Sequence, residues 1–243
     1  AGIGRVFCDR LAARGHDLIA LAREAGRLDA VGRELATRHG VRVEPLRADL
    51  THDDEIARVA ERIRAGPALA VLVNNAGFGT RGRLAESDPA AQSAMLHLHT
   101  LAPMRLSQAA LRGMLARRAG AIVNVSSVAS FIYAPGNVNY CATKAYLTVF
   151  SEGLAAEVAG TGVRVQALCP GFTRTEFHQR MGLQQPELKR RRPWMTAEYV
   201  VDYSLRCLDR GGPVVCVPDW RYKALVALLG VFPRRWLGKV TAR

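Results

Sequence analysis

Six short apolar runs alternate with longer stretches of helical character along the 243 residues of this chain. The runs lie at about residues 17–22, 41–47, 70–73, 121–125, 163–169 and 214–217. Strands that alternate with helices in this way form a parallel sheet with helices on both faces. The length suits one doubly wound α/β sheet, and the 49% of hydrophobic residues supply a sizeable core. We therefore expect a single α/β domain over residues 1–243, without internal repeats.

The longest expected helix begins at Asp88 and Pro89. Asp is a favoured N-cap residue, and Pro is well tolerated in the first turn of a helix. We expect this helix to continue to about Leu115.

Tyr140 and Lys144 are separated by four residues, so on a helix their side chains lie on one face. A cation within a few ångströms favours the phenolate, and a depression of the tyrosine pKa by roughly three units would suit general acid/base catalysis near pH 7. By itself the spacing is weak evidence, because a packed tyrosine and a solvated lysine often share a helix face. Its meaning depends on the neighbouring segments.

Ser127 follows the apolar run at 121–125 directly after Ser126. Ligands of open α/β sheets bind beyond the carboxyl ends of the strands, where the hydroxyl of Ser127 can donate a hydrogen bond to a substrate oxygen. A helix or turn cap is the alternative, and it suits Ser126 better because strand alternation directs only one of the two residues into the crevice.

Two further segments contain small residues at positions suited to a cofactor. Asn74-Asn75-Ala76-Gly77 ends the run at 70–73, and Gly2-Ile3-Gly4 opens an amphipathic stretch. Glycines at a helix amino terminus allow a pyrophosphate to approach the backbone closely.

Together these segments resemble the classical short-chain dehydrogenase/reductase family over nearly the whole chain. Gly2-Ile3-Gly4 is similar to the tail of its glycine-rich loop, Asp49-Leu50 to its adenine-contacting pair, and Asn74-Asn75-Ala76-Gly77 to its sheet-stabilising motif. Ser127, Tyr140 and Lys144 match its catalytic positions, and Pro170-Gly171-Phe172-Thr173-Arg174-Thr175 resembles its Pro-Gly loop. Five such matches in the family's order are very improbable by chance.

The resemblance implies a Rossmann-like fold and hydride transfer between a nicotinamide and a substrate carbon, with proton exchange at Tyr140. Ser127 would polarise the carbonyl, and Lys144 would lower the pKa of Tyr140 and bind the nicotinamide ribose. With His99, these residues are the candidate catalytic group. The candidate cofactor-binding residues are Gly2, Ile3, Gly4, Arg23, Asp49, Leu50, Asn75, Ala76, Gly77, Tyr140, Lys144, Pro170, Gly171, Thr173 and Thr175.

Arg23 bears on the choice of cofactor. NAD users usually have an acidic residue at the end of the second strand, where this chain has Ala22 followed by Arg23. A guanidinium can pair with the 2′-phosphate, so we expect NADP(H) to be preferred over NAD(H). A solvated surface arginine is the alternative.

His99 occupies the place of an Asn that anchors a water in the family's proton relay. The imidazole can bind a water and relay protons, but its larger plane can also displace that water. A satisfied core histidine is an equal alternative. The sequence therefore does not decide which route the proton takes, although the Tyr140 and Lys144 pair is complete.

The chain opens at Ala1 without the family's first strand and the Thr-Gly that begins its glycine loop. That strand lies in the middle of the family's sheet, so we expect a gap between the run at 17–22 and the strand at Val71. A truncated record of a longer protein is a simpler explanation than a shortened gene product.

The formal net charge of +13 raises the alternative of nucleic-acid binding. The charges are scattered, and the one run, Lys189-Arg190-Arg191-Arg192, has no interleaved aromatic residues. A solvated lid or a contact for an acidic substrate fits it equally well. We expect no nucleic-acid partner. A non-catalytic NADP(H) sensor is a further alternative, against which the intact Ser127, Tyr140 and Lys144 argue.

Five dispersed cysteines indicate neither a disulfide framework nor a metal site, and no signal peptide is visible, so we expect a cytoplasmic protein without metal. A lid at about 174–196 contains apolar residues and indicates a small apolar carbonyl or alcohol as substrate, unless these residues pack against their own domain. They are Phe177, Met181, Leu183, Trp194 and Met195.

The apolar segment at about 223–237 is too short to span a bilayer, and we favour a packed or subunit-contact helix over peripheral membrane contact. Family analogy suggests a homodimer or homotetramer through the helices at about 88–115 and 139–160.

Overall fold

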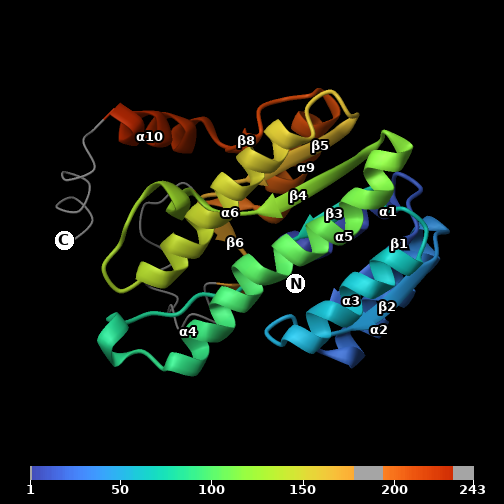
Figure 1. The fold of residues 1–243 in the computed structure, drawn as a ribbon, viewed down its shortest axis with the longest axis horizontal. Coiled ribbons are helices and arrows are strands. Elements are labelled where there is room, and N and C mark those ends of the chain that lie inside the picture. The colour runs from blue at the N-terminus through green and yellow to red at the C-terminus, as the bar shows by residue number, and fades with distance from the viewer. Residues whose placement is uncertain (1, 178–193, 232–243) are drawn as a thin grey trace.

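The computed structural model describes residues 2–177 and 194–231, and it shows the expected α/β architecture (Figure 1). The strands are β1 (Leu18–Ala22), β2 (Val43–Arg47), β3 (Val71–Asn74), β4 (Gly120–Val125), β5 (Val163–Leu168), β6 (Thr173–Arg174), β7 (Met195–Thr196) and β8 (Val215–Cys216). The α-helices are α1 (Gly2–Ala12), α2 (Ala25–His39), α3 (Asp53–Ala65), α4 (Pro89–Leu96), α5 (Ala102–Arg117), α6 (Val138–Glu157), α9 (Ala197–Asp209) and α10 (Trp220–Val231).

The strands at the centre of the fold form a four-stranded parallel sheet in the order β3-β4-β5-β8. β4 is buried at every position after Gly120, as expected for a strand that is covered on both faces. All six expected strands are present, and each lies within two residues of its expected limits. β6 and β7 were not expected, because two residues are too few to form a recognisable apolar pattern.

β1 and β2 form a separate parallel pair, and β1 is not hydrogen-bonded to β3 in the described part of the chain. The expected gap at this place is thus visible in the sheet order. Whether a further strand precedes Ala1 in a longer protein stays a prediction.

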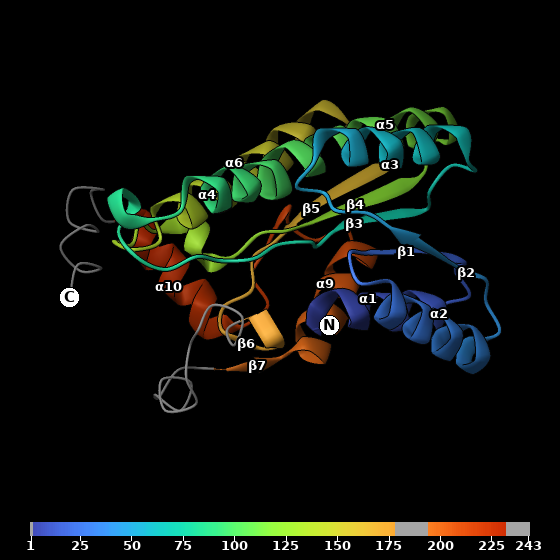
Figure 2. The same ribbon diagram turned by 90° about the horizontal axis from the view of Figure 1, so that it is seen from below.

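Helices cover both faces of the sheet (Figure 2). α3, α4, α5 and α6 lie on one side, and α1, α2 and α9 lie on the other. Each side has its own apolar core, with Ile122 of β4 facing one cluster and Val123 facing the other. Because successive side chains of β4 point to opposite faces of the sheet, this strand contributes to both cores.

The expected helix at 88–115 is interrupted by a π-helical turn at His97–Leu101. It begins as expected, because the carboxylate of Asp88 accepts hydrogen bonds from the backbone N–H groups of Ala90 and Ala91. Pro103 has no N–H to bond the carbonyl of His99, so the regular α-helical ladder cannot continue here. The wide turn directs His99 into the protein interior, where its side chain is buried.

Candidate active site

Tyr140 and Lys144 lie in the first two turns of α6, and Lys144 reaches the carboxyl end of β4. Lys144 is buried, and its Nζ donates a hydrogen bond of 2.9 Å to the carbonyl of Val125, the last residue of β4. The same Nζ lies 5.8 Å from the centre of the Tyr140 ring. The spacing of four residues thus places the ammonium beside the phenol, as the sequence predicts.

The two serines after β4 have different partners. The hydroxyl of Ser126 is buried and donates to the carbonyl of Lys144 at 2.8 Å, so Ser126 ties β4 to α6. Ser127 caps the following 3₁₀ turn, Val128–Phe131, and also forms a hydrogen bond to the side chain of Tyr140. Of the two serines, Ser127 is therefore the one that contacts Tyr140.

The expected depression of the Tyr140 pKa is not found. Burial raises the pKa of Tyr140 to about 12, although the hydrogen bond from Ser127 opposes this rise. Burial also lowers the pKa of Lys144 to about 8. Both side chains lie in a poorly solvated place, so desolvation outweighs their mutual attraction. At neutral pH Tyr140 is a protonated phenol, which suits a general acid in the direction of carbonyl reduction.

His99 packs against the turn of α6 that contains Tyr140 and Lys144. Its ring centroid is 5.9 Å from that of Tyr140 with the planes nearly perpendicular, and its Nδ1 is 3.0 Å from the hydroxyl of Thr143. Its Nε2 accepts a hydrogen bond of 3.2 Å from the backbone N–H of Phe78, in the loop after β3. The sequence reasoning missed Thr143, because a threonine one residue before Lys144 carries no recognisable signal.

The burial of His99 predicts a measurable dependence of stability on pH. Burial, followed by the charge of Lys144, lowers the pKa of His99 well below its usual value. Below about pH 6.5 the unfolded chain gains a proton at this residue, whereas the folded protein does not. The contribution of His99 to the free energy of unfolding is therefore present above that pH and is lost as the pH falls below it.

We expect the free energy of unfolding to fall by about 1.4 kcal/mol per pH unit through this group between roughly pH 6.5 and 5. A urea titration of wild type and His99→Gln at several pH values measures the difference. Equal slopes for the two proteins would show that His99 titrates in the folded state.

The amino end of α1 meets two of the expected cofactor loops. A Cβ built on Gly2 would lie 2.8 Å from Cγ2 of Thr175, and one on Gly4 would lie 2.5 Å from Nδ2 of Asn75. A side chain at either position would therefore force a side chain of these loops to shift. The helix amino terminus, the loop after β3 and the Pro-Gly loop therefore converge at one edge of the sheet, where backbone N–H groups can hold an anionic pyrophosphate.

Arg23 and Asp49 lie together at the carboxyl ends of β1 and β2. A guanidinium nitrogen of Arg23 is 3.8 Å from a carboxylate oxygen of Asp49, and 63% of the Arg23 side chain is exposed. Burial raises the pKa of Asp49, but hydrogen bonds from Thr51 and the charge of Arg23 lower it overall. The neighbouring Leu50 is buried. Asp49 thus holds Arg23 near the carboxyl ends of these two strands, and Arg23 remains accessible to a ligand.

The Pro-Gly loop is anchored by α10. The hydroxyl of Tyr222 accepts a hydrogen bond of 3.0 Å from the backbone N–H of Phe172. The aromatic ring of Tyr222 also fills the space that a side chain at Gly171 would need. Sequence reasoning missed Tyr222, which lies 50 residues after Phe172 and belongs to no motif.

Part of the expected lid lies outside the described residues, including Met181, Leu183 and the basic run at 189–192. The ring of Phe177 lies 5.9 Å from that of Tyr140, so this residue faces the catalytic group. Trp194 packs on Phe172 at 5.3 Å, and Met195 is buried. The described lid residues therefore divide between contact with the site and packing within the domain.

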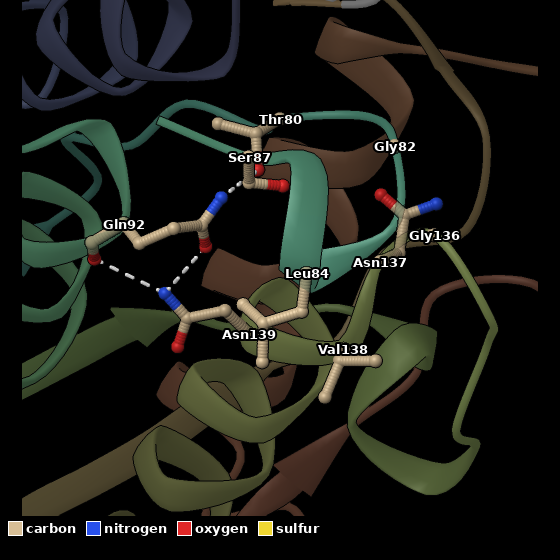
Figure 3. Close-up of a pocket in the computed structure, with 9 residues that line it drawn as sticks. All are labelled: Thr80, Gly82, Leu84, Ser87, Gln92, Gly136, Asn137, Val138 and Asn139. Atoms are coloured by element: carbon tan, nitrogen blue, oxygen red, sulfur yellow. Dashed lines mark hydrogen bonds between the residues drawn. The ribbon is translucent and has the colours of Figure 1, made fainter. Parts of the chain in front are cut away.

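A small polar pocket lies beside the amino end of α6 (Figure 3). Gln92 crosses it, since its amide donates to Thr80 at 3.1 Å and its side-chain oxygen accepts from Asn139 at 2.9 Å. The remaining lining residues are Gly82, Leu84, Ser87, Gly136, Asn137 and Val138. Asn139 directly precedes Tyr140, so these bonds help to fix the start of α6.

All five cysteines are free thiols. Among the described residues, no three His, Cys, Asp or Glu side chains lie close enough together to hold a metal ion. Within residues 2–177 and 194–231, no helix has the length and apolar character needed to cross a bilayer.

Comparison with known proteins places this arrangement in a family. The short chain dehydrogenase family model matches residues 1–186. The 3-oxoacyl-[acyl-carrier-protein] reductase FabG of Aquifex aeolicus is 35% identical over 178 residues, which are 72% of this chain and 71% of that protein.

Two solved structures show the same fold. A short-chain dehydrogenase from Sphingobium yanoikuyae in complex with NADPH has a TM-score of 0.84 and 35% identity, and the match covers 96% of this chain and 92% of that one. The bulky-bulky ketone specific alcohol dehydrogenase from Comamonas testosteroni has a TM-score of 0.79 and 30% identity with the same coverage. The chain therefore belongs to the short-chain dehydrogenase/reductase family, whose members are oxidoreductases that act on CH–OH and C=O groups.

Proposed function

We propose that this protein is an NADP(H)-dependent oxidoreductase that interconverts a carbonyl and an alcohol on an apolar substrate. The observation that carries the proposal is the grouping of Ser127, Tyr140 and Lys144 at the carboxyl end of β4. This is the edge of an open α/β sheet at which ligands bind. Glycines, amide side chains and a helix amino terminus at the same edge fit the pyrophosphate and nicotinamide of such a cofactor.

The bound nicotinamide cofactor would supply or accept the hydride. Tyr140 would donate the proton to the substrate oxygen in reduction, and its raised pKa keeps that proton in place at neutral pH. The hydroxyl of Ser127 would hold the same oxygen. Lys144 would stabilise the tyrosinate that forms when the proton leaves. The charge of its ammonium acts strongly there because the site is poorly solvated.

The proposal is tested by steady-state oxidation of NADPH with a panel of ketones and 3-oxoacyl thioesters, followed by the absorbance of the reduced nicotinamide. We expect turnover with at least one bulky apolar carbonyl, because the ring of Phe177 lies against Tyr140. Binding of NADPH without turnover of any carbonyl or alcohol would instead support the sensor alternative.

Arg23 supports the proposed preference for NADP(H). Its guanidinium lies at the end of β1, is largely exposed, and within the described residues pairs with the carboxylate of Asp49 at 3.8 Å. A bidentate bond from this group to a 2′-phosphate is charge-assisted and therefore strong. The Sphingobium yanoikuyae relative was solved in complex with NADPH, which agrees with this choice.

Substitution of Arg23 by Glu is expected to raise the KM for NADPH between about tenfold and a hundredfold, since a charged hydrogen bond is lost and a repulsive charge is gained. The KM for NADH should change by less than about threefold, because NADH lacks the phosphate. Arg33→Glu is the matched control, since Arg33 is exposed and lies more than two turns into α2. An equal effect of Arg23→Glu on both cofactors would contradict the assigned role.

The remaining expectations concern the state of the protein in the cell. We propose a homodimer or homotetramer formed through α4, α5 and α6, supported by the exposed apolar side chains of Leu96, Tyr146 and Val149. We also propose one domain over residues 1–243 and a cytoplasmic location. α10 remains a candidate subunit contact, since Leu225 and Leu228 are exposed.

We do not propose a nucleic-acid partner. Many of the arginines form ion pairs with carboxylates across the described surface, such as Arg62 with Glu44 and Arg27 with Glu176. Paired arginines are less available to phosphates. Elution of the protein from heparin at physiological salt would agree with this view, and retention would contradict it.

A further inference from the structure

His99 lies where three segments of the active site meet, and 1% of its surface is exposed. It belongs to the π-helical turn His97–Leu101 and contacts both the loop after β3 and the catalytic turn of α6. The first of these segments lines the proposed cofactor site, and the second contains Tyr140 and Lys144. The ring therefore joins the two halves of the site.

The hydrogen bonds of His99 determine its tautomer. The backbone N–H of Phe78 can only donate, so Nε2 must accept and carries no proton. A neutral imidazole then has its proton on Nδ1, which donates to the hydroxyl of Thr143. That hydroxyl in turn donates to the carbonyl of Tyr140 at 2.9 Å. Each donor in this chain has an acceptor, and both ring nitrogens are engaged by the protein.

The charges around the ring favour the neutral form. Lys144 and Tyr140 face it from α6, and one is a buried cation while the other is a protonated phenol. Gly77 and Phe78 on the loop, and Thr143 on α6, carry no charge. No carboxylate among the described residues forms a recorded hydrogen bond or ion pair with His99. Protonation would therefore place a second buried cation near Lys144 without compensation.

The ring is also closely packed. A Cβ added to Gly77 would lie 2.8 Å from Nε2 of His99, so the loop backbone approaches the ring directly. The ring of Phe78 lies 6.1 Å from it on one side and that of Tyr140 lies 5.9 Å from it on another. A change in the position of His99 must therefore displace either the loop or the catalytic turn.

We infer that His99 is a positioning residue that fixes the Gly77–Phe78 loop against the Tyr140–Lys144 turn, and that it does not carry a proton in the reaction. A relay through its ring would require Nε2 to release the Phe78 N–H or Nδ1 to release Thr143. The inference rests on the proposed function, because it assigns a role within the same site. Of the two alternatives that the sequence left open, it favours a satisfied core histidine over a member of the proton relay.

Kinetics separate positioning from proton transfer. If His99 positions the loop, His99→Ala should raise the Kd and KM for NADPH by about tenfold, because a buried hydrogen bond that orders the loop is lost. The kcat should stay within about threefold, and the pH profiles of kcat and kcat/KM should keep their shape. A proton carrier would instead show a large loss of kcat, an altered pH profile and an unchanged Kd.

Four variants accompany His99→Ala, the last of them as a control. His99→Gln and His99→Asn fill more of the space and keep one donor and one acceptor, so partial rescue of the Kd is expected even if the alanine variant is unstable. Thr143→Val removes the partner of Nδ1 and leaves Nε2 with Phe78, so a smaller effect in the same direction is expected. His97→Gln is the control, since His97 lies in the same turn and contacts Asp53 away from the site.

Nitrogen-15 NMR of the wild-type histidines provides a measurement that does not depend on catalytic turnover. The inference requires one histidine that stays neutral from pH 6 to 8, with its proton on Nδ1, and whose signals are absent in His99→Gln. A titrating ring or the opposite tautomer would overturn it, as would variants with unchanged Kd. Failure of the wild type to oxidise NADPH would reject the proposed function alone, because NADPH binding and NMR still report on His99.

Discussion

Tyr140→Phe is expected to lower kcat by between about a hundredfold and ten-thousandfold, the range that a positioned general acid contributes. The substitution removes one oxygen and keeps the ring, so the contacts with His99 and Phe177 remain. Because the phenol is protonated at neutral pH, its loss leaves no donor at this position for the developing alkoxide. The Kd for NADPH should change by less than about threefold, since the hydroxyl bonds Ser127 and the substitution retains the ring.

The measurement compares kcat by NADPH oxidation with Kd by NADPH fluorescence. Tyr146→Phe is the matched control, because Tyr146 lies on α6 with 41% exposure and stacks on Phe150. It undergoes the same chemical change six residues away and should retain full activity. Turnover of Tyr140→Phe within tenfold of wild type would reject Tyr140 as the general acid.

Lys144→Met is expected to change activity and stability in opposite directions. The buried ammonium donates a hydrogen bond to the carbonyl of Val125, and burial lowers the pKa of Lys144 to about 8. Moving this pKa down from the unfolded value disfavours the folded state by roughly 3 kcal/mol at neutral pH. Methionine has a similar length and carries no charge, so the free energy of unfolding should stay equal or rise.

The kcat/KM of the same variant should fall by at least about a hundredfold, because a fixed charge beside the tyrosinate is worth most in a poorly solvated site. Wild type should also gain stability as the pH rises from about 8 toward the unfolded lysine value of about 10.4, since the buried lysine then loses its proton, and Lys144→Met should lack this gain. Activity assays and urea unfolding at two pH values provide both readings.

Lys223→Met is the control for the loss of a lysine charge, since Lys223 lies on α10 and bonds the hydroxyl of Tyr203. Its activity should match that of wild type. A loss of stability in Lys144→Met together with full activity would contradict both parts of the prediction. Such a result would make Lys144 a structural residue.

The strands and the family were predictable because their signals are local. Each of the six apolar runs is recognisable within a few residues, and the structure confirms a strand at all six. The π-helical turn at His97–Leu101 was not expected, although Pro103 lies two residues beyond it. A proline inside an expected long helix does not by itself show whether the helix kinks, ends or widens.

The protonation states were not predictable from spacing. Four residues between Tyr140 and Lys144 suggest mutual stabilisation of the charged forms, and the expected lower tyrosine pKa follows from that pair alone. In the folded protein desolvation dominates and raises the pKa of Tyr140 to about 12. The burial comes from residues far away in the sequence, such as Phe177 and His99, whose rings pack against that of Tyr140.

The sequence by itself determined the order of strands and helices, the position of Tyr140 and Lys144 on one helix face and the membership in an oxidoreductase family. These properties follow from periodicity and from motifs of a few adjacent residues. Only the tertiary structure decided that Tyr140 is protonated, that Tyr222 supports the Pro-Gly loop and that both nitrogens of His99 are engaged. Burial and hydrogen-bond partners depend on residues that the fold brings together from distant parts of the chain, and no local pattern records those neighbours.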